Sequence, residues 1–294
     1  MEARGGMAEA AGPTVRQRQL GMRLRAIRLE KSLSVDAVAR ELECSPSKIS
    51  RLETATRRPN PRDVRDLCRF YGLDDAASGE LVELAREAKE PGWWQQFPDV
   101  GLALVPYIGL EPNASTITSF AAFYVPALLQ TADYAQAIIK GIAPRMSPEV
   151  LRDRVEIRLR RQEILNRDRP PRYRVFIDES VLHRPTGGPK VMVAQIDRIL
   201  ELIEEHKVIA QIVPFDVGVL ASQDSNFVLL EFEDRDLSPV VFVESLQNGQ
   251  IMEREVDVLR YREAIDALRD SALTTRETKA RFVQMRETYE SAVQ

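Results

Sequence analysis

The stretch Ser45–Pro59, SPSKISRLETATRRP, decides the fold of the N-terminal part of the chain. Ser45 followed by Pro46 is typical of a helix N-cap with proline at the first helical position. Ile49 and Leu52 then recur three residues apart, which gives the helix one inward face. The intervening positions are polar and are predicted to point outward: Ser47, Lys48, Ser50 and Arg51. The stretch therefore predicts a short helix with a polar outer face.

Four more short helices are predicted around this one, giving a compact all-α domain over residues 14–89. Hydrophobic spacing and capping residues place them at about Val15–Glu30, Val35–Glu43, Pro61–Tyr71 and Asp75–Lys89. About three residues separate the second helix from the helix at Pro46, which is typical of a helix-turn-helix. Ala39 is small enough to let this helix pair approach closely.

Charge is distributed unevenly along the 294 residues, whose formal net charge is −4. Residues 14–72 hold 14 Lys/Arg against 7 Asp/Glu, which is +7, and residues 1–13 add −1. The other 222 residues therefore sum to −10. A basic module on an acidic body favours a polyanion-binding head.

The string SxxxISRLE, starting at Ser45, resembles the recognition helix of phage-repressor-like (XRE-family) helix-turn-helix proteins. The resemblance implies binding to double-stranded DNA, with Ser47 and Arg51 at the base-reading positions. Arginine can bond guanine through two hydrogen bonds. Phosphate contacts are predicted at the helix N-terminus, at Lys48 and in the following loop. The predicted DNA-contacting set is Ser45, Ser47, Lys48, Ser50, Arg51, Arg57 and Arg58.

Simpler interpretations stay open at this point. Arg51 could form a surface ion pair with Glu53 or Asp36. Arg57 and Arg58 could be solvated loop residues. The whole domain could also be a helical adaptor that does not bind DNA.

Several residues depart from the family pattern. Glu43 stands at a turn position where glycine is common, so it must accept an unusual backbone conformation or reshape the turn. Ala55 and Ser32 also replace common glycines. Val35 replaces a common phosphate-binding glutamine. Pro46 occupies a common base-contact position and has no N–H to donate.

Residues 90–294 are predicted to form a larger helix-rich α+β domain, so the fold class is mainly α with a smaller α+β part. Residues 90–170 are expected to be helical, residues 171–250 to contain a small sheet of about four strands, and residues 251–294 to form two closing helices. The first is marked by Met252, Val256 and Leu259, and the second starts at a capping box from Thr274 to Glu277 and carries Phe282, Met285 and Tyr289 on its inner face. Val150–Arg174 holds nine Arg against four Asp/Glu. This segment is either a solvated helix with ion pairs, a second DNA-backbone contact or a dock for an acidic partner.

An ordered set of strings resembles the C-terminal domain of the WhiJ-like transcriptional regulators of actinobacteria. The strings are GWW, YIGLE, VPxLLQTxDYA, RRQEIL, PPxYRVFIDESxLHRPxGG, VMVAQI, VPF, NFVLLEF and VVFVES. The resemblance covers about Leu20–Val283, and Ala127 replaces a usual glycine. It implies gene regulation and a small acidic partner protein that modulates DNA binding. A homodimer is expected separately, because one helix-turn-helix reads too few base pairs for specificity in a genome. It implies no catalytic residues.

A one-component regulator that senses a small molecule is the alternative function. A convergent polar pocket around Glu111, Asp178 and Glu179 would favour it, whereas an apolar groove would favour a protein partner. Catalysis is not expected, because His183 and His206 are the only histidines and neither has metal-ligand spacing. His183 is flanked by Asp178, Glu179 and Arg184, which resembles an acid-base cluster, but a structural loop after a strand is the expected interpretation. No cofactor is predicted.

Composition places the chain among ordinary soluble proteins, with 44% hydrophobic and 29% charged residues. Residues 1–13 lack an apolar segment typical of a signal peptide, and we expect them to form a disordered leader. The two cysteines give no disulfide framework. A cytoplasmic protein without membrane contact is therefore expected.

Overall fold

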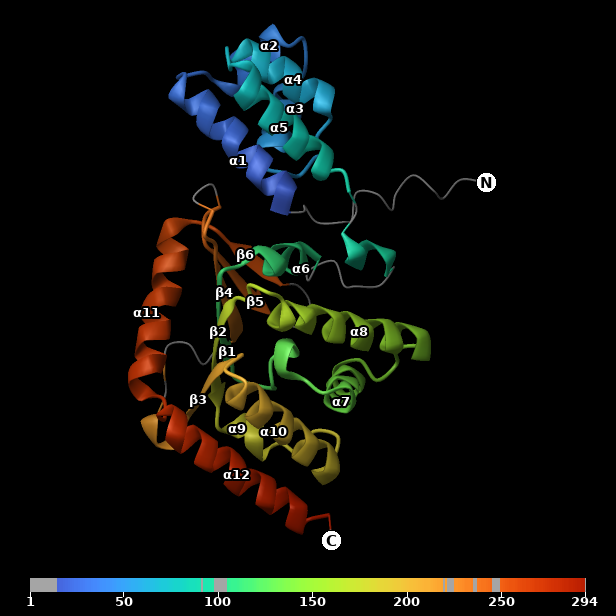
Figure 1. Ribbon diagram of the computed structural model, residues 1–294, viewed down its shortest axis with the longest axis vertical. Coiled ribbons are helices and arrows are strands. Elements are labelled where there is room, and N and C mark those ends of the chain that lie inside the picture. The colour runs from blue at the N-terminus through green and yellow to red at the C-terminus, as the bar shows by residue number, and fades with distance from the viewer. Residues whose placement is uncertain are drawn as a thin grey trace. The chain divides into compact units, whose positions relative to one another are not determined.

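The computed structural model describes residues 15–90, 92–97, 105–218, 220, 225–234, 237–244 and 249–293. The predicted leader lies outside these residues. Contacts divide the chain into two compact units, which are described separately. Unit 1 comprises residues 1–96, 104–113 and 233–238, and unit 2 comprises residues 97–103, 114–232 and 239–294. Unit 1 holds a helix-turn-helix bundle and unit 2 a helix-rich α+β fold, which confirms the predicted fold class (Figure 1).

Five helices form the bundle of unit 1, close to their predicted positions. They are α1 (Val15–Glu30), α2 (Val35–Glu41), α3 (Pro46–Glu53), α4 (Pro61–Phe70) and α5 (Asp75–Glu87). A side chain caps the N-terminus of each of the last four, and the predicted cap at Ser45 is among them. The buried core of the bundle includes Leu20, Leu24, Val38, Ile49 and Leu67.

Unit 1 also contains three short helical segments: η1 (Trp93–Gln96), α6 (Val105–Leu110) and η2 (Glu111–Asn113). The Glu111 carboxylate is buried and accepts a hydrogen bond of 2.6 Å from the Tyr107 hydroxyl. This bond ties α6 to η2 and satisfies a carboxylate that would otherwise be costly to bury.

A six-stranded sheet forms the centre of unit 2, in the order β3-β2-β1-β4-β5-β6. The strands β1, β2 and β3 are parallel, while β4, β5 and β6 continue the sheet in antiparallel fashion. Their bounds are β1 (Thr116–Ala121), β2 (Arg172–Asp178), β3 (Ile209–Val213), β4 (Asn226–Glu231), β5 (Val240–Glu244) and β6 (Gln250–Met252).

The sequence predicted about four strands, and β1 and β6 were not among them. β6 has only three residues. β1 is a central strand within the segment expected to be helical, and five of its six residues are buried. It shows no alternation of polar and apolar residues because both of its faces are covered. Its buried Ser119 hydroxyl lies 3.2 Å from the Tyr173 hydroxyl of β2, so the polar side chain is satisfied inside.

Helices cover both faces of the sheet in unit 2 (Figure 1). On one side lies α11 (Glu255–Ser271), and on the other lie α7 (Ala132–Ile142), α8 (Pro148–Arg161) and α10 (Pro189–Glu204). The short helix α9 (Ser180–His183) follows β2, and α12 (Thr275–Ser291) packs against α10 and β3. Three 3₁₀ turns complete the unit: η3 (Ala127–Leu129), η4 (Gln162–Asn166) and η5 (Phe215–Val217).

The sequence predicted the inner face of the closing helix α12 but did not identify that of α11. On α12 the predicted residues Phe282, Met285 and Tyr289 are buried, and the capping box from Thr274 to Glu277 is present. On α11, Val256 and Leu259, which mark this helix in the sequence, are exposed, with 51% and 53% of their surface accessible. Val258, Ile265 and Leu268 are buried instead, because this stripe faces the sheet.

None of the helices in the described residues combines the length and the apolar composition needed to cross a membrane.

Candidate nucleic-acid interface

The outer face of α3 is polar and open to solvent. Ser47, Ser50 and Arg51 are exposed, whereas Ile49 and Leu52 are buried against the other helices of the bundle. The Arg51 Nε donates a hydrogen bond of 3.2 Å to the Ser47 carbonyl oxygen, which holds the guanidinium along the helix surface. The face can therefore offer hydroxyl and guanidinium groups to a nucleic-acid groove.

The ion pair considered for Arg51 does not form. The Glu53 side chain points into the bundle, where both of its carboxylate oxygens bond to Arg28. In the described part of the chain Arg51 has no ion pair with Asp36 either. The Arg51 guanidinium thus remains available for a ligand on the outer face.

Ser45 caps α3 and still has a hydroxyl hydrogen that it can donate. Its Oγ accepts a hydrogen bond of 3.2 Å from the Lys48 backbone N–H, which caps α3. A hydroxyl that accepts one bond still has its own O–H to donate. Because phosphate oxygens are acceptors, the exposed Ser45 can cap the helix and contact a phosphate at the same time.

Lys48 is only partly available for a phosphate contact. Its Nζ lies 2.9 Å from the Asp63 Oδ1 on α4, and both side chains are about one quarter exposed. The pair borders a hollow of about 220 Å³ between α2, α3 and α4. Sequence reasoning missed this pair, because Asp63 lies 15 positions from Lys48 in a different helix.

The loop after α3 carries Arg57 and Arg58, both exposed. Two threonine hydroxyls fix its start: Thr54 donates to the Ser50 carbonyl at 2.9 Å, and Thr56 donates to the Arg51 carbonyl at 3.3 Å. The Arg57 backbone N–H bonds the same Arg51 carbonyl at 3.1 Å. These bonds place Arg57 directly beyond the C-terminus of α3, next to the predicted contact surface.

Residues Ser32, Glu43 and Ala55 all adopt the left-handed conformation, with φ of 55°, 48° and 57°. They are the three positions in the bundle at which the sequence departs from a common glycine. Each follows a helix end in the bundle, where this conformation lets backbone N–H groups reach the last carbonyls. The turns therefore keep the backbone geometry that glycine usually adopts. Ser32, Glu43 and Ala55 adopt it although a left-handed backbone is unfavourable for residues with a Cβ atom.

The turn between α2 and α3 shows this geometry in detail. The Cys44 N–H bonds the Ala39 carbonyl at 2.8 Å, and the Glu43 N–H bonds the Arg40 carbonyl at 3.2 Å. This pair of bonds is a Schellman motif with Glu43 at its left-handed position. The exposed Glu43 carboxylate therefore sits in the turn of the helix pair, where it opposes a polyanion.

Val35, at the position of the common phosphate-binding glutamine, packs against the core of the bundle. It therefore supports the fold at a position where the family often binds a phosphate.

Two contacts behind α3 fix its position, and neither was predicted. Arg28 of α1 and Glu53 of α3 form a buried ion pair. Gly21 of α1 lies against the C-terminal end of α3, so close that an added Cβ would stand 2.5 Å from the Glu53 carbonyl oxygen. A glycine inside an amphipathic helix pattern was the one available signal for this contact.

The acidic residues proposed to line a sensor pocket do not converge within either unit. Glu111 belongs to unit 1 and bonds Tyr107. In unit 2, Glu179 is buried, pairs with Arg281 and accepts the Phe215 N–H at 3.0 Å. Asp178 accepts the Ser180 N–H at 2.9 Å. These carboxylates are engaged in structural contacts.

The arginine-rich segment is partly internal to unit 2. On α8, Arg161 is buried, and burial followed by the like charge of Arg161 lowers the pKa of Arg158 to about 10. Arg152 is exposed and lies 3.5 Å from Glu149. At least two of these arginines thus face the protein and are poorly placed for a DNA backbone.

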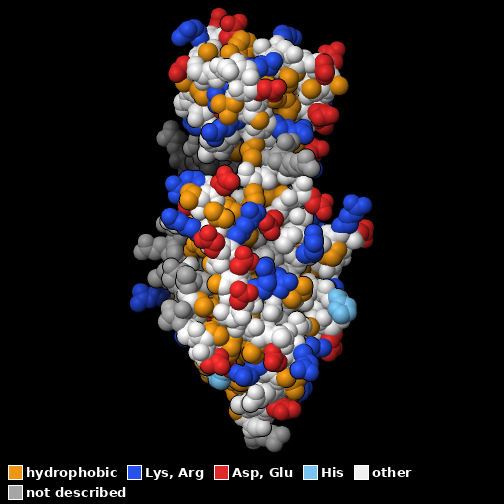
Figure 2. Space-filling model, turned by 90° about the vertical axis from the view of Figure 1, so that its left-hand side faces the viewer, with side chains coloured by type: hydrophobic (Ala, Val, Ile, Leu, Met, Phe, Trp, Pro, Cys, Tyr) orange, Lys and Arg blue, Asp and Glu red, His pale blue; other side chains and the backbone are white. Residues whose placement is uncertain are grey.

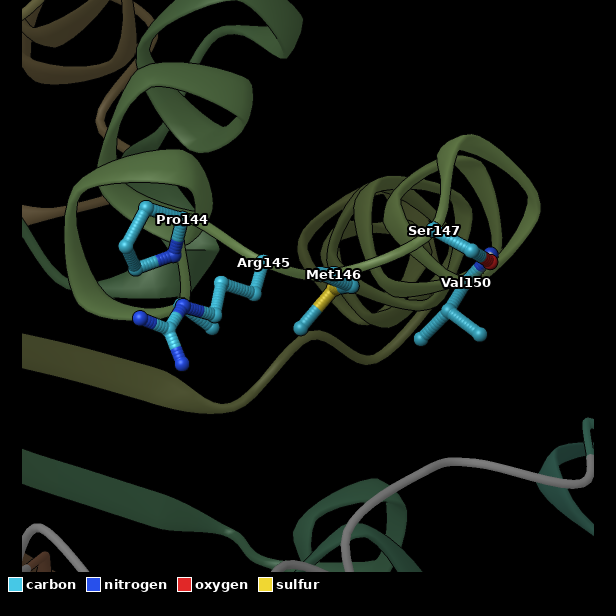
Figure 3. Close-up of a pocket in the computed structure, with 6 residues that line it drawn as sticks. Pro144, Arg145, Met146, Ser147 and Val150 are labelled. Carbon is cyan, nitrogen blue, oxygen red and sulfur yellow. The ribbon is translucent and has the colours of Figure 1, made fainter.

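A shallow hollow of about 390 Å³ lies where α7 connects to α8. Figure 3 shows its lining, in which Arg145 and Met146 extend from the connection and Val150 comes from the start of α8. Arg145 is its only charged lining residue, so it offers few polar groups to orient a ligand.

Two family models match the chain. One is described as a helix-turn-helix domain and matches residues 19–81, which contain the whole α2–α3 pair. The other is described as a domain of unknown function (DUF5753) and matches residues 104–284. Searches of curated proteins and of solved structures found no match. The helix-turn-helix match supports an XRE-like, DNA-binding regulator.

Proposed function

The chain belongs to the family defined by the domain of unknown function DUF5753, and from that premise we propose that it is a sequence-specific, DNA-binding transcriptional regulator. The outer face of α3 carries this proposal, because its exposed side chains are polar and lie on the second helix of a helix-turn-helix. Proteins with this motif insert that helix into the major groove.

The contact residues divide into two groups under this proposal. Ser47 and Arg51 read base edges, with Ser50 beside them on the same face. Ser45, Lys48, Arg57 and Arg58 bind phosphates and set the register of the helix on the duplex. No catalytic step and no cofactor form part of the proposed function.

Unit 2 is proposed to pair two chains. One helix-turn-helix reads too few base pairs for specificity in a genome, whereas a dimer reads two half-sites. Val256 and Leu259 lie one turn apart on α11 and are more than half exposed, so they are the proposed dimer contact. Figure 2 looks onto this side of unit 2, where apolar patches lie among interspersed charges.

The WhiJ-like resemblance adds finer proposals. They are an actinobacterial origin and a small acidic partner protein that modulates DNA binding. A cytoplasmic location is proposed from the composition and from the two unpaired cysteines. The basic character of residues 14–72, at +7 from 14 Lys/Arg and 7 Asp/Glu, supports an acidic partner that competes with DNA.

The test selects binding sites for the full chain from a pool of random DNA duplexes. We expect an enriched palindrome whose half-sites lie about one helical turn apart, roughly 10 base pairs. Sedimentation should give a dimer for the natural chain and a monomer for Leu259→Glu. Ile142→Glu is the matched control, since Ile142 is 52% exposed but lies on α7. Absence of any enriched sequence would contradict the proposal, and a dimeric Leu259→Glu would contradict the α11 contact.

A small-molecule sensor is the second candidate function, and one observation favours it. A hollow of about 700 Å³ lies in unit 2 at the amino ends of β1, β2 and β3. That volume is in the range of natural ligand pockets, about 300–1,000 Å³.

A further inference from the structure

The hollow at the amino ends of β1, β2 and β3, here called the amino-edge groove, has a positively charged lining. Its charged lining residues are Arg167, Arg172, Arg174, Lys207 and Arg269 against Glu205 and Glu231. The two carboxylates are already engaged, since Glu205 lies 2.8 Å from Lys207 and Glu231 lies 2.7 Å from Arg262. Arg172 and Arg174 are therefore not neutralised by the two acids that line the groove.

Sheet register explains why these arginines meet. Arg172 and Arg174 alternate along β2 and so point to the same face, beside Thr116 and Thr118 of β1. Two residues further on, Phe176 belongs to the core that α11 covers. The groove therefore lies on the same face of the sheet as α11, at the end that α11 does not cover. Arg269 of α11 is one of its lining residues.

Arg174 is the central cation of the groove. It is half-buried, and its Nη1 donates 2.7 Å to the neutral Gln211 Oε1. Within the described residues neither Arg172 nor Arg174 has a carboxylate partner. Burial, and then the like charge of Arg269, lower the pKa of Arg174. The Arg174 and Arg269 guanidinium groups thus lie near each other and share no acid. A bound anion would offset the repulsion between them.

We propose that the amino-edge groove binds a small organic phosphate. The forked guanidinium groups of Arg172, Arg174 and Arg269 match phosphate oxygens, and Thr116 and Thr118 add hydroxyl donors. A phosphoryl group alone would leave most of the volume unfilled. The exposed Ile209 and Pro170 provide apolar contact for the rest of the molecule.

Two macromolecular occupants fit the groove less well. An acidic peptide that adds a strand to β3 is blocked, because the Leu273 N–H already bonds the Ile212 carbonyl and the Thr278 Oγ1 accepts the Ile212 N–H. A DNA duplex would meet a body that is acidic overall, since residues 73–294 sum to −10. A small anion needs only the local charge.

This inference deepens the second candidate function, and its test contains no DNA, so its failure is distinguishable from failure of DNA binding. The full chain is titrated with inorganic pyrophosphate in a calorimeter. We expect binding in the natural chain and at least about tenfold weaker binding in Arg174→Gln and in Arg269→Gln, the effect of one lost charge-assisted hydrogen bond. Arg152→Gln, an exposed arginine of α8 outside the groove, should bind like the natural chain.

Arg269→Gln still tests the proposal if Arg174→Gln fails to fold. Arg269 is about half exposed, and in the described residues it pairs only with the exposed Asp266, so its loss should not disturb the fold. Unchanged circular dichroism and unfolding midpoint confirm that the fold persists. Equal pyrophosphate affinity in all variants, or no binding at millimolar pyrophosphate, would overturn the proposal. Tighter binding of citrate than of pyrophosphate would overturn the choice of phosphate. Binding of polyglutamate or duplex DNA at these arginines without pyrophosphate binding would overturn the small-molecule assignment.

Discussion

Arg28 and Glu53 form a buried two-pronged ion pair that fastens α3 to α1. Arg28 Nε lies 2.6 Å from Glu53 Oε1, and Arg28 Nη2 lies 2.8 Å from Glu53 Oε2. A third bond of 2.8 Å runs from Arg28 Nη1 to the Leu33 carbonyl, just before α2. One side chain thus connects α3, the loop between α1 and α2, and α1 itself. This connection fixes the angle of α3 within the bundle.

Loss of one partner of this pair should strongly destabilise unit 1. Glu53→Gln leaves the Arg28 charge buried without a countercharge, and we expect a loss of about 3–5 kcal/mol in unfolding free energy. Denaturant unfolding, read by hydrogen exchange in α1 and α3, measures it. Glu83→Gln removes the exposed partner of Arg86 and should cost about 0–1 kcal/mol. If Glu53→Gln cost no more than Glu83→Gln, the pair would not hold α3.

Replacing Glu43, which has a left-handed backbone, by glycine should increase both stability and DNA affinity. Glu43→Gly removes a conformational cost of about 1–2 kcal/mol but adds an entropy cost of roughly 0.5–1 kcal/mol, so stability should rise by up to about 1.5 kcal/mol. It also removes a negative charge and should tighten DNA binding. Glu43→Gln separates the two effects, since it removes the charge but keeps the side chain.

Ser32→Gly is the second control for Glu43→Gly. Ser32 has the same left-handed backbone and no charge, so stability should rise while DNA affinity stays unchanged. Thermal unfolding and fluorescence anisotropy with DNA measure the two quantities. Lower stability of both glycine variants would show that these turns are not strained.

The pair between Lys48 and Asp63 should restrain DNA binding. Asp63→Asn releases the Lys48 ammonium, so affinity should rise and the dependence of log K on log[salt] should steepen by about one unit. Asp66→Asn removes the same charge one turn along α4, from an exposed residue. Equal effects of the two variants on affinity and slope would indicate only long-range electrostatics and no competition for Lys48.

Local signals in the sequence predicted much of unit 1. Capping residues located the helix starts, and the family pattern identified the three turns that adopt left-handed backbones at Ser32, Glu43 and Ala55. These features depend on neighbours a few residues away, so sequence reveals them. The predicted contact residues are exposed around α3, except that Lys48 is partly engaged by Asp63.

Features set by distant residues could not be predicted. The Arg28–Glu53 pair joins positions 25 residues apart, and both residues look like ordinary surface charges in the sequence. β1 escaped detection because a strand covered on both faces shows no period of two. The inner face of α11 could not be identified because apolar residues occur on both of its sides, and only the sheet decides which are buried.

Base reading by α3 is the central claim, and Arg51→Ala compared with Arg57→Ala tests it most directly. The measurement is equilibrium binding of each full-length variant to the selected operator and to single-base variants of it, over a range of salt. Arg51→Ala should lose about 1–3 kcal/mol of discrimination at one base position. Arg57→Ala should weaken binding to every sequence alike and reduce the salt slope by about one unit. Unchanged base preference in Arg51→Ala would contradict the account.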